Sequence, residues 1–445
     1  MPSREDITYF GAGPALLPTA VLESAAGALQ NYNSTGLGLA EHSHRSPLAN
    51  KILADTKEYL CSFLSIPDSH EVLFMQGGGS GQFSSVVYNL VSVWVERRRR
   101  RAEQELASSE KEELEQRVLS RLRKEVAEEL KLDYLVTGSW TLKASQEAAK
   151  LLGPEHVNVA LDSRKQNAGK FGLIPGEETW TLTPTQREGG KGSAFVYYCD
   201  NETVDGVEFP SFPKSLEPQG QDEEDERIII ADMSSNILSR KIDVSKFGVI
   251  FAGAQKNIGL TGLTLVIIRR SLLPPATLSP SAALLRSLSL PIGPIVFDYA
   301  TIAANNSLYN TLSIFDVWVA GQVIKSLLDT HGDAKINGME AVADKKAALI
   351  YEVLEKWQTQ GVYKMVAGKG ARSRMNICFR VGDEGPSEKA WLEGADKRGL
   401  TGLKGHRSVG GIRVSNYNSV PADGMEKLAK YMEEFAEAHF KNAES

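Results

Sequence analysis

Short runs of apolar and β-branched residues, separated by stretches with helical character, constrain the fold of this 445-residue chain more than any other feature. The clearest runs occupy 71–76, 132–140, 193–199, 227–233, 247–255 and 263–270. Several are apolar throughout, as strands covered on both faces by helices tend to be. The alternation predicts an α/β protein with a mainly parallel sheet. Because only a short glycine-bearing turn separates the last two runs, we expect that pair to be antiparallel.

The sequence pattern changes near residue 320. Long amphipathic helical patterns begin there, and isolated strand patterns such as 374–381 follow them. This change predicts a smaller α+β domain at the C-terminal end of the chain. Between the strand runs, the acidic stretch 219–226 is expected to form a surface loop, and the proline-rich stretch 274–294 an irregular connection.

Residues 96–131 interrupt the alternation with a highly charged stretch. Its apolar residues recur at intervals of three and four and so predict a helical insertion; they are Leu114, Val118, Leu119, Leu122, Val126 and Leu130. The arginine run 97–101 could contact an acidic partner, but glutamates follow it at helical spacing, and a solvated helix face is the simpler interpretation. We expect no catalytic role for this insertion.

Charge and cysteine usage limit the kinds of partner. The formal net charge of −6 gives no general attraction to nucleic acid or to an anionic membrane. No stretch approaches the ~20 consecutive apolar residues of a membrane span, and the charged start MPSREDITYF lacks the apolar stretch of a signal peptide. The cysteines, Cys61, Cys199 and Cys378, lie far apart, which is typical of a reducing compartment. These features favour a cytoplasmic protein that acts on small molecules.

The sequence MQGGGSGQF at 75–83 places four glycines directly after a strand run and before a helical pattern. Bare backbone amides at a helix N-terminus form an anion site that suits phosphate. The stretch lacks the lysine and the spacing of a GxxxxGK[ST] loop, so hydrolysis of a nucleoside triphosphate is poorly supported. A glycine-rich turn that merely enters a helix is the alternative.

Two further strand runs end near groups of opposite charge. Asp232 ends the run IIIAD, and Lys256 follows the next run, among the small residues of AGAQKNIG. Ligands of open α/β sheets bind outside the carboxyl ends of the strands, so this pair can share one rim with the glycine loop. A plain salt bridge is one interpretation. The sharper one is pyridoxal phosphate, with its phosphate in the loop, Asp232 on the pyridine nitrogen and Lys256 as the Schiff-base amine. Trp140 could then stack on the ring, and Thr203 could hydrogen-bond the ring hydroxyl.

Several motifs, taken together, point to one enzyme family. They are HSHR (42–45), GGGSGQF (77–83), TGSW (137–140), NETVDG (201–206), ADMSSNILSR (231–240), AGAQKNIG (252–259), SRMN (373–376) and LKGHRSVGGIR (403–413). As a set they resemble the phosphoserine aminotransferases, which are class-V, fold-type-I pyridoxal-phosphate enzymes. The resemblance runs from residue 10 almost to the C-terminus, and it is interrupted mainly by the 96–131 insertion and an altered 271–300 region.

The resemblance implies a domain organisation and an assembly. A large pyridoxal-phosphate domain with a mainly parallel seven-stranded sheet would span 18–322, and a small domain would combine 1–17 with 323–445. The family is homodimeric, and Asn310 and Thr311 would reach the cofactor phosphate of the second subunit.

The resemblance also implies roles at the cofactor. Lys256 would carry the cofactor and shuttle a proton between the substrate Cα and the cofactor. Asp232 would pair with the pyridinium, Trp140 would stack on the ring, and Thr203 would hydrogen-bond its phenolate oxygen. The remaining contacts to the phosphate would come from Gly79, Ser80 and Gln255. No metal is expected.

For the substrates, the resemblance implies transfer of an amino group between O-phospho-L-serine and 2-oxoglutarate, giving 3-phosphooxypyruvate and L-glutamate. Arg413 would bind the substrate α-carboxylate as a guanidinium fork. One cluster would receive either the distal phosphate or the γ-carboxylate of glutamate; it comprises His44, Arg45, His406 and Arg407.

The sequence departs from common family patterns at Ser80, where some members have arginine, and at Ala12, where some have serine. These departures leave open how the distal phosphate is neutralised and whether 4-phosphohydroxy-L-threonine is also a substrate. Two alternatives remain from the sequence alone. One is another class-V activity, such as alanine–glyoxylate transamination, and the other is a non-catalytic binding protein on the same fold.

Overall fold

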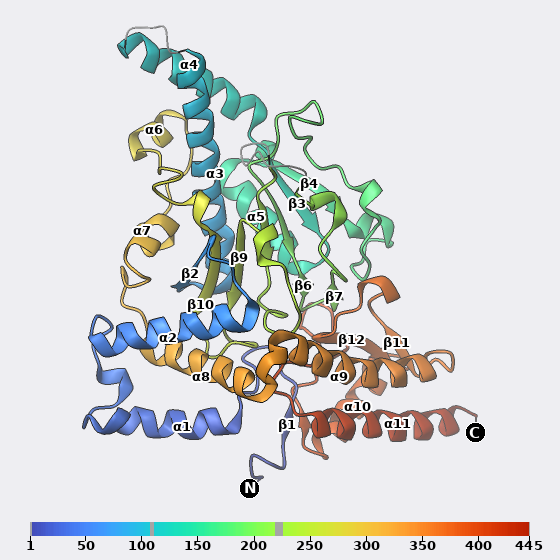
Figure 1. Ribbon diagram of the computed structural model, residues 1–445. Coiled ribbons are helices and arrows are strands. Elements are labelled where there is room, and N and C mark those ends of the chain that lie inside the picture. The colour runs from blue at the N-terminus through green and yellow to red at the C-terminus, as the bar shows by residue number, and fades with distance from the viewer. Residues whose placement is uncertain (1, 107–110, 219–225, 445) are drawn as a thin grey trace.

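The computed structural model describes residues 2–106, 111–218 and 226–444, and within them a seven-stranded sheet forms the centre of the molecule (Figure 1). Its strand order is β2 (His70–Met75), β10 (Thr264–Arg269), β9 (Val249–Gly253), β8 (Ile229–Asp232), β5 (Phe195–Cys199), β3 (Leu132–Val136) and β4 (Val157–Asp162). Strand β10 is antiparallel to both of its neighbours, and the other pairings in this sheet are parallel. The predicted α/β class, the mainly parallel sheet and the antiparallel last pair are confirmed.

Helices cover both faces of this sheet, and the strands alternate between the two resulting cores. In β10, Leu265 and Ile267 join one hydrophobic cluster, whereas Val266 and Ile268 join the other, because successive side chains of a strand point to opposite faces. The first cluster lies under α1 (Thr19–Gln30), α2 (Pro47–Leu64) and α8 (Ile314–His331). The second lies under α3 (Gly78–Glu105), α4 (Lys111–Glu129) and α5 (Ser139–Leu152).

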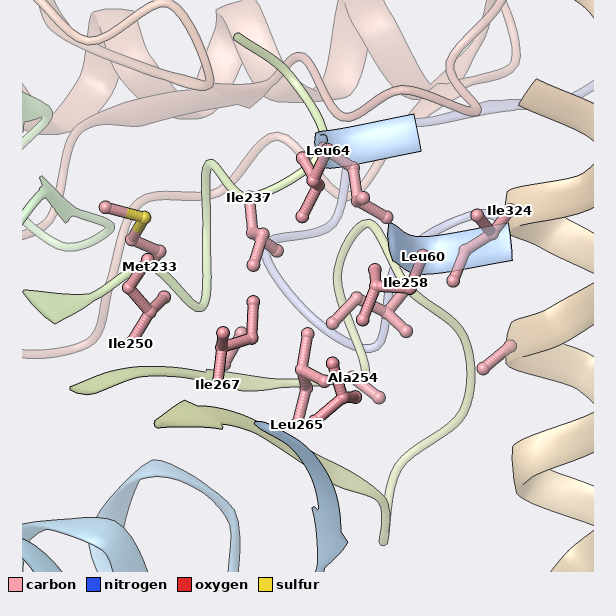
Figure 2. Close-up of a cluster of buried hydrophobic side chains, with 14 of the residues drawn as sticks. Leu60, Leu64, Met233, Ile237, Ile250, Ala254, Ile258, Leu265, Ile267 and Ile324 are labelled. Carbon is pink, nitrogen blue, oxygen red and sulfur yellow. The ribbon is translucent and has the colours of Figure 1, made fainter. Parts of the chain in front are cut away.

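The first cluster also holds the turn that follows β9. Figure 2 shows Ala254 and Ile258 from this turn among Leu265 of β10, Leu60 of α2 and Ile324 of α8. Both turn residues are almost fully buried. The backbone of the turn is fixed as well, because the Ala254 amide donates to the carbonyl of Leu263 at 3.0 Å. The lysine between these two anchors, Lys256, therefore projects from a rigid turn.

A second, antiparallel sheet lies in the C-terminal part of the chain. It consists of β11 (Tyr363–Met365), β12 (Asn376–Val381) and β14 (Ile412–Ser415), and it packs with α9 (Lys335–Gln358), α10 (Gly385–Asp396) and α11 (Ala422–Glu444). The strand expected within 374–381 is confirmed. Near the N-terminus, β1 (Thr8–Tyr9) pairs in parallel with β13 (Leu400–Thr401), so the first residues join this C-terminal part. The remaining short elements are β6 (Asn201–Glu202), β7 (Val207–Glu208), α6 (Ala282–Ser287) and α7 (Tyr299–Ala304).

The arginine run does not form the solvated face that its sequence suggested. The run belongs to the end of α3, and α4 folds back against it with Val118, Leu122 and Val126 buried. Arg98 is only 7% exposed and pairs with Glu129 of α4 at 2.7 Å. The buried Glu96 binds the two arginines that follow Arg98. The predicted helical character of 96–131 is confirmed where the structure describes it, but much of the run's charge is neutralised within and between the two helices.

Other differences lie at the edges of elements. The edge strand β4 was not predicted. The expected strand 132–140 ends at Val136, because Thr137 and Gly138 lead into α5, which begins at Ser139. The stretch 274–294 contains the short helix α6 within its irregular path. Apart from Glu226, the acidic stretch 219–226 lies outside the described residues. Within the described ranges, every helix is too short or too polar to cross a membrane.

Candidate active site

A cavity of about 200 Å³ opens at the rim where the parallel strands have their carboxyl ends. Segments that follow β2, β3, β5, β8 and β9 all contribute to its wall, as expected for a ligand site in an open α/β sheet. The lining residues are Gly77, Gly78, Gly79, Ser80, Phe83, Trp140, Cys199, Asn201, Thr203, Asp232, Ser234, Ser235, Gln255 and Lys256. The sequence-predicted glycine loop, acid and amine therefore share one cavity.

Lys256 is held in this wall by the turn after β9, and its amine points to Thr203. The distance from Nζ to Thr203 Oγ1 is 2.7 Å, and the lysine is 9% exposed. Burial lowers the pKa of the Lys256 amine, although the nearby Asp232 carboxylate acts in the opposite direction. A lowered pKa increases the fraction of neutral amine, which is the nucleophilic form.

One carboxylate oxygen of Asp232 accepts hydrogen bonds from Ser234, and the other faces the cavity. Its Oδ1 accepts hydrogen bonds from the Ser234 amide at 2.9 Å and from the Ser234 hydroxyl at 2.6 Å. A Cβ atom built on Gly79 would lie 3.7 Å from Oδ2. Burial raises the pKa of Asp232, although both bonds from Ser234 lower it. A cation placed against Oδ2 would lower this pKa and so favour the ionised form.

The glycine loop reaches the cavity at the N-terminus of α3. Gly77 has a φ of 96°, a conformation that favours glycine, and Cβ atoms on Gly77 and Gly81 would each lie 3.1 Å from the ring of Phe297. The Gly78 amide donates to Thr264 Oγ1 at 2.9 Å. The next amides, of Gly79 and Ser80, belong to the first helical turn, where N–H groups have no intrahelical acceptor. The loop can therefore offer backbone donors to an anion.

Trp140 lines the same cavity, and two acidic residues that sequence reasoning missed fix its backbone. Glu202 accepts the Trp140 amide at 2.8 Å, and Asp205 accepts the amide of the preceding Ser139 at 2.9 Å. Burial, reinforced by the neighbouring Asp205, raises the pKa of Glu202 to about 7. Both acids flank Thr203 in NETVDG, so the motif contained the signal, but nothing in the sequence identified their partners.

Cationic groups approach the same region from β14 and the loop before it. Arg413 Nη1 donates to the carbonyl oxygen of Thr203 at 3.3 Å. His406 lies on the loop, where its Nδ1 is 2.7 Å from Ser408 Oγ. Partial burial lowers the pKa of His406, and the positive charges of Arg413, Lys143 and Arg407 add to this effect. The arrangement concentrates positive charge beside the cavity.

Comparisons with known proteins agree with this geometry. The family model described as aminotransferase class-V matches residues 7–103 and 156–428. The phosphoserine aminotransferase of Saccharomyces cerevisiae is 42% identical over 434 residues, which cover 98% of this chain and 98% of that protein. This chain belongs to the phosphoserine aminotransferase family.

Solved structures of phosphoserine aminotransferases share the fold over nearly the whole chain. The protein from Bacillus circulans subsp. alkalophilus is 32% identical with a TM-score of 0.77, and the match covers 98% of this chain and 99% of that one. The PLP-bound protein from Trichomonas vaginalis is 30% identical with a TM-score of 0.73, and the match covers 96% of this chain and 99% of that one. The expected fold type and family are thus confirmed.

The class-V aminotransferase model leaves residues 104–155 of this chain unmatched, and this range differs from the predicted insertion at 96–131. It begins later than residue 96 and extends beyond α4 through β3 and α5. The part of α3 that carries the arginine run, 97–101, therefore lies inside the matched region.

The other predicted residues of this aminotransferase lie outside the cavity wall. Asn310 and Thr311 are exposed and contact Gln76, just before the glycine loop. The Asn310 side-chain Nδ2 donates to Gln76 Oε1, and Gln76 Nε2 donates to the Thr311 carbonyl at 3.1 Å. His44 and Arg45 lie in the loop before α2. Among the described residues, no hydrogen bond or ion pair joins His44 or Arg45 to the cavity wall.

Proposed function

We propose that this member of the phosphoserine aminotransferase family transfers an amino group between O-phospho-L-serine and 2-oxoglutarate, giving 3-phosphooxypyruvate and L-glutamate, in the direction of serine synthesis. As a class-V aminotransferase it uses pyridoxal phosphate. The observation that carries the proposal is the placement of Lys256 and Asp232 in one cavity with the N-terminus of a glycine-initiated helix.

The residues present fit this cofactor. Asp232 Oδ2 and the Cα of Gly79 face each other across a gap that a side chain at position 79 would enter. Trp140 Nε1 is buried and has no hydrogen-bond acceptor among the described residues. Its N–H group can therefore donate to a ligand in the cavity. Gly79, Ser80 and Gln255 would hold the phosphate, and the cofactor, when bound, supplies an electron sink for the substrate Cα.

Each protein group then has a defined task. The Lys256 amine would attach the cofactor and afterwards move a proton to and from the substrate Cα. Asp232 would keep the ring nitrogen protonated by offering Oδ2 as a carboxylate acceptor. Thr203, already 2.7 Å from the Lys256 amine, would hydrogen-bond the ring oxygen. Trp140 would cover the ring face and exclude water.

Substrate recognition rests on anion binding. Arg413 would form the fork for the α-carboxylate, since its guanidinium already reaches the carbonyl of Thr203 beside the lysine. His406 and Arg407 would receive the distal phosphate or the γ-carboxylate of glutamate. We place His44 and Arg45 in the same anion cluster on family resemblance.

We further propose a homodimer in which Asn310 and Thr311 reach the cofactor of the partner subunit. Their exposure beside Gln76 and the glycine loop supports this role. The pairing of β1 with β13 supports a small domain of 1–17 and 323–445 and a large domain of 18–322. We propose a cytoplasmic location, which the free, separated cysteines support.

The test is a titration of the purified holoenzyme with phosphoserine, 4-phosphohydroxy-L-threonine, glutamate, alanine and serine, followed by the visible absorbance of the bound cofactor. We expect phosphoserine and glutamate to react and serine and alanine to react far more slowly. If unphosphorylated serine reacted as well as phosphoserine, the anion-binding proposal would be wrong. Absence of any half-reaction would favour a binding protein on this fold.

Lys256→Ala tests the chemistry at the amine. We expect loss of both half-reactions and of the visible band of the lysine-bound cofactor. Lys241→Ala is the matched control, because Lys241 is exposed and outside the cavity wall. A Lys256→Ala protein that transaminated at a rate comparable to that of the control would refute the assignment.

A further inference from the structure

Helix α5 carries Trp140 in its first turn, yet no side chain from its own N-terminal flank caps it. Its N-cap residue is Gly138, which has no side chain to offer. The first-turn amides bond instead to two carboxylates of the β6–β7 hairpin, which lies far away in the sequence. Asp205 Oδ2 accepts the amide and the hydroxyl of Ser139, each at 2.9 Å. Glu202 accepts hydrogen bonds from the next two amides, those of Trp140 and Thr141.

Glu202 makes the closest of these contacts. Its Oε2 accepts the Trp140 amide at 2.8 Å, and its Oε1 accepts the Thr141 amide at 2.8 Å and the Thr141 hydroxyl at 2.7 Å. The side chain is fully buried. Burying a carboxylate costs free energy unless hydrogen bonds compensate it, and here both oxygens are used.

The residue that follows Glu202 connects this cap to the reactive amine. Thr203 Oγ1 lies 2.7 Å from Lys256 Nζ, and the Thr203 carbonyl accepts a hydrogen bond from Arg413. Glu202 is therefore bonded covalently to Thr203, which orients Lys256, and by a hydrogen bond to Trp140, which lines the same cavity. Other ionisable groups whose charge interacts with Glu202 are Asp205, Cys199, Tyr197 and Lys256 itself, whose pKa the Glu202 carboxylate raises.

Packing at Gly138 shows how little the carboxylate can move. A Cβ atom on Gly138 would lie 2.4 Å from the Glu202 Cδ and Cγ atoms. The φ of Gly138 is −167°, an extended conformation open to any residue, so the contact with Glu202 is what disfavours a side chain there. The carboxylate thus occupies a site closed on several sides.

We propose that Glu202 is a positioning residue of the transamination site: it fixes the Trp140 wall relative to the Thr203–Lys256 pair and so sets how the cofactor ring is held between them. This inference rests on the proposed function. It assigns Glu202 no contact with substrate or cofactor. If the Glu202 carboxylate is disturbed, we expect the orientation of the bound cofactor ring to change, while Lys256 can still bind the cofactor.

Glu202→Gln in the holoenzyme is the first test. Glutamine has nearly the same shape, but it cannot accept all three hydrogen bonds, because its amide group donates. We expect the visible absorbance of the lysine-bound cofactor to persist, its visible circular dichroism per unit absorbance to fall by half or more, and kcat to fall roughly 10- to 100-fold, the range for losing one or two charge-assisted bonds. The KM for glutamate should change less than about threefold, because Glu202 contacts no proposed anion-binding side chain.

Glu177→Gln is the matched control, because Glu177 also accepts two consecutive backbone amides, those of Lys214 and Ser215, but lies outside the cavity wall. We expect its dichroism and kcat to be unchanged. Should Glu202→Gln fail to fold, Gly138→Ala provides the test, because the added methyl displaces the carboxylate without removing its charge, and the same fall in dichroism is expected.

Unchanged dichroism together with a kcat within about twofold of the wild type in the folded variant would overturn the proposal. Failure of the proposed function would look different, since the wild-type holoenzyme itself would then not react with glutamate or phosphoserine.

Discussion

Glu208 tests how the segments that follow the central sheet are held to the segment before β12. It lies on β7, is 2% exposed, and accepts the Arg374 amide at 2.7 Å and its guanidinium at 2.9 Å. Arg240 lies 3.9 Å away and also pairs with the buried Asp200 at 2.6 Å. Glu208→Gln would keep the shape and remove the charge, leaving the partly buried guanidinium groups of Arg374 and Arg240 less well compensated. Removing one partner of a buried ion pair costs about 3–5 kcal/mol of unfolding free energy. We expect a value near the lower end, because Arg240 retains its ion pair with Asp200.

The assay is urea-induced unfolding of the holoenzyme, since an uncharged denaturant does not screen the ion pairs. Glu355→Gln is the control, because Glu355 pairs with Arg372 in the same segment, but its side chain is 49% exposed. An exposed pair contributes about 0–1 kcal/mol. If Glu208→Gln lowered the free energy of unfolding no more than Glu355→Gln does, the argument from burial would fail.

The pH dependence of this difference has a definite sign. Burial by itself raises the pKa of Glu208, but the charges of Arg374 and Arg240 outweigh it and leave the pKa below the ordinary value of 4.5. A carboxylate with a lowered folded-state pKa stabilises the protein fully above the unfolded-state pKa, and this stabilisation is lost as pH falls through the folded-state pKa. The gap in free energy of unfolding between wild type and Glu208→Gln should therefore be largest at neutral pH and shrink below about pH 4.5.

Further predictions concern the insertion and the site. Leu122→Ala should cost about 2–5 kcal/mol of stability by opening a cavity between α3 and α4, and the rate of the glutamate half-reaction should not change; a lower rate would show that the insertion affects catalysis. Arg413→Lys should raise the KM for phosphoserine and glutamate about 10-fold or more, because an ammonium cannot form the two-pronged carboxylate contact; equal KM values would refute its role. Ser234→Ala removes a hydrogen bond that lowers the pKa of Asp232 and should weaken cofactor binding by about 10-fold in a pyridoxal-phosphate titration; unchanged affinity would count against Asp232 as the ring partner.

The sequence was a good guide to the strands that are buried on both faces. The runs at 193–199, 227–233, 247–255 and 263–270 each contain a strand of the central sheet, because continuous apolar character reports burial directly. Strand β4 was missed because only two of its residues are buried, and Val159 in its first half is 36% exposed. The other edge strand, β2, is buried over almost its whole length, and its run at 71–76 was predicted.

Local patterns also located the glycine loop, Asp232 and Lys256, because each follows a recognisable strand. The roles of Glu202 and Asp205 could not be found in this way. Glu202 lies 62 positions from the tryptophan whose amide it accepts, and a carboxylate in a loop is normally solvated. A cap supplied from a distant segment depends on the tertiary structure and has no local spacing by which to recognise it.

The burial of the turn around Lys256 bears on attempts to move this site into another protein. Copying the segment AGAQKNIG alone would leave Ala254 and Ile258 without the surface that receives them (Figure 2). In a foreign scaffold those two side chains would seek other contacts, and the lysine would lose its fixed direction. The smallest transferable unit therefore includes β9, β10 and the facing sides of α2 and α8. A redesign that began from the helices and added the reactive turn last would respect that dependence.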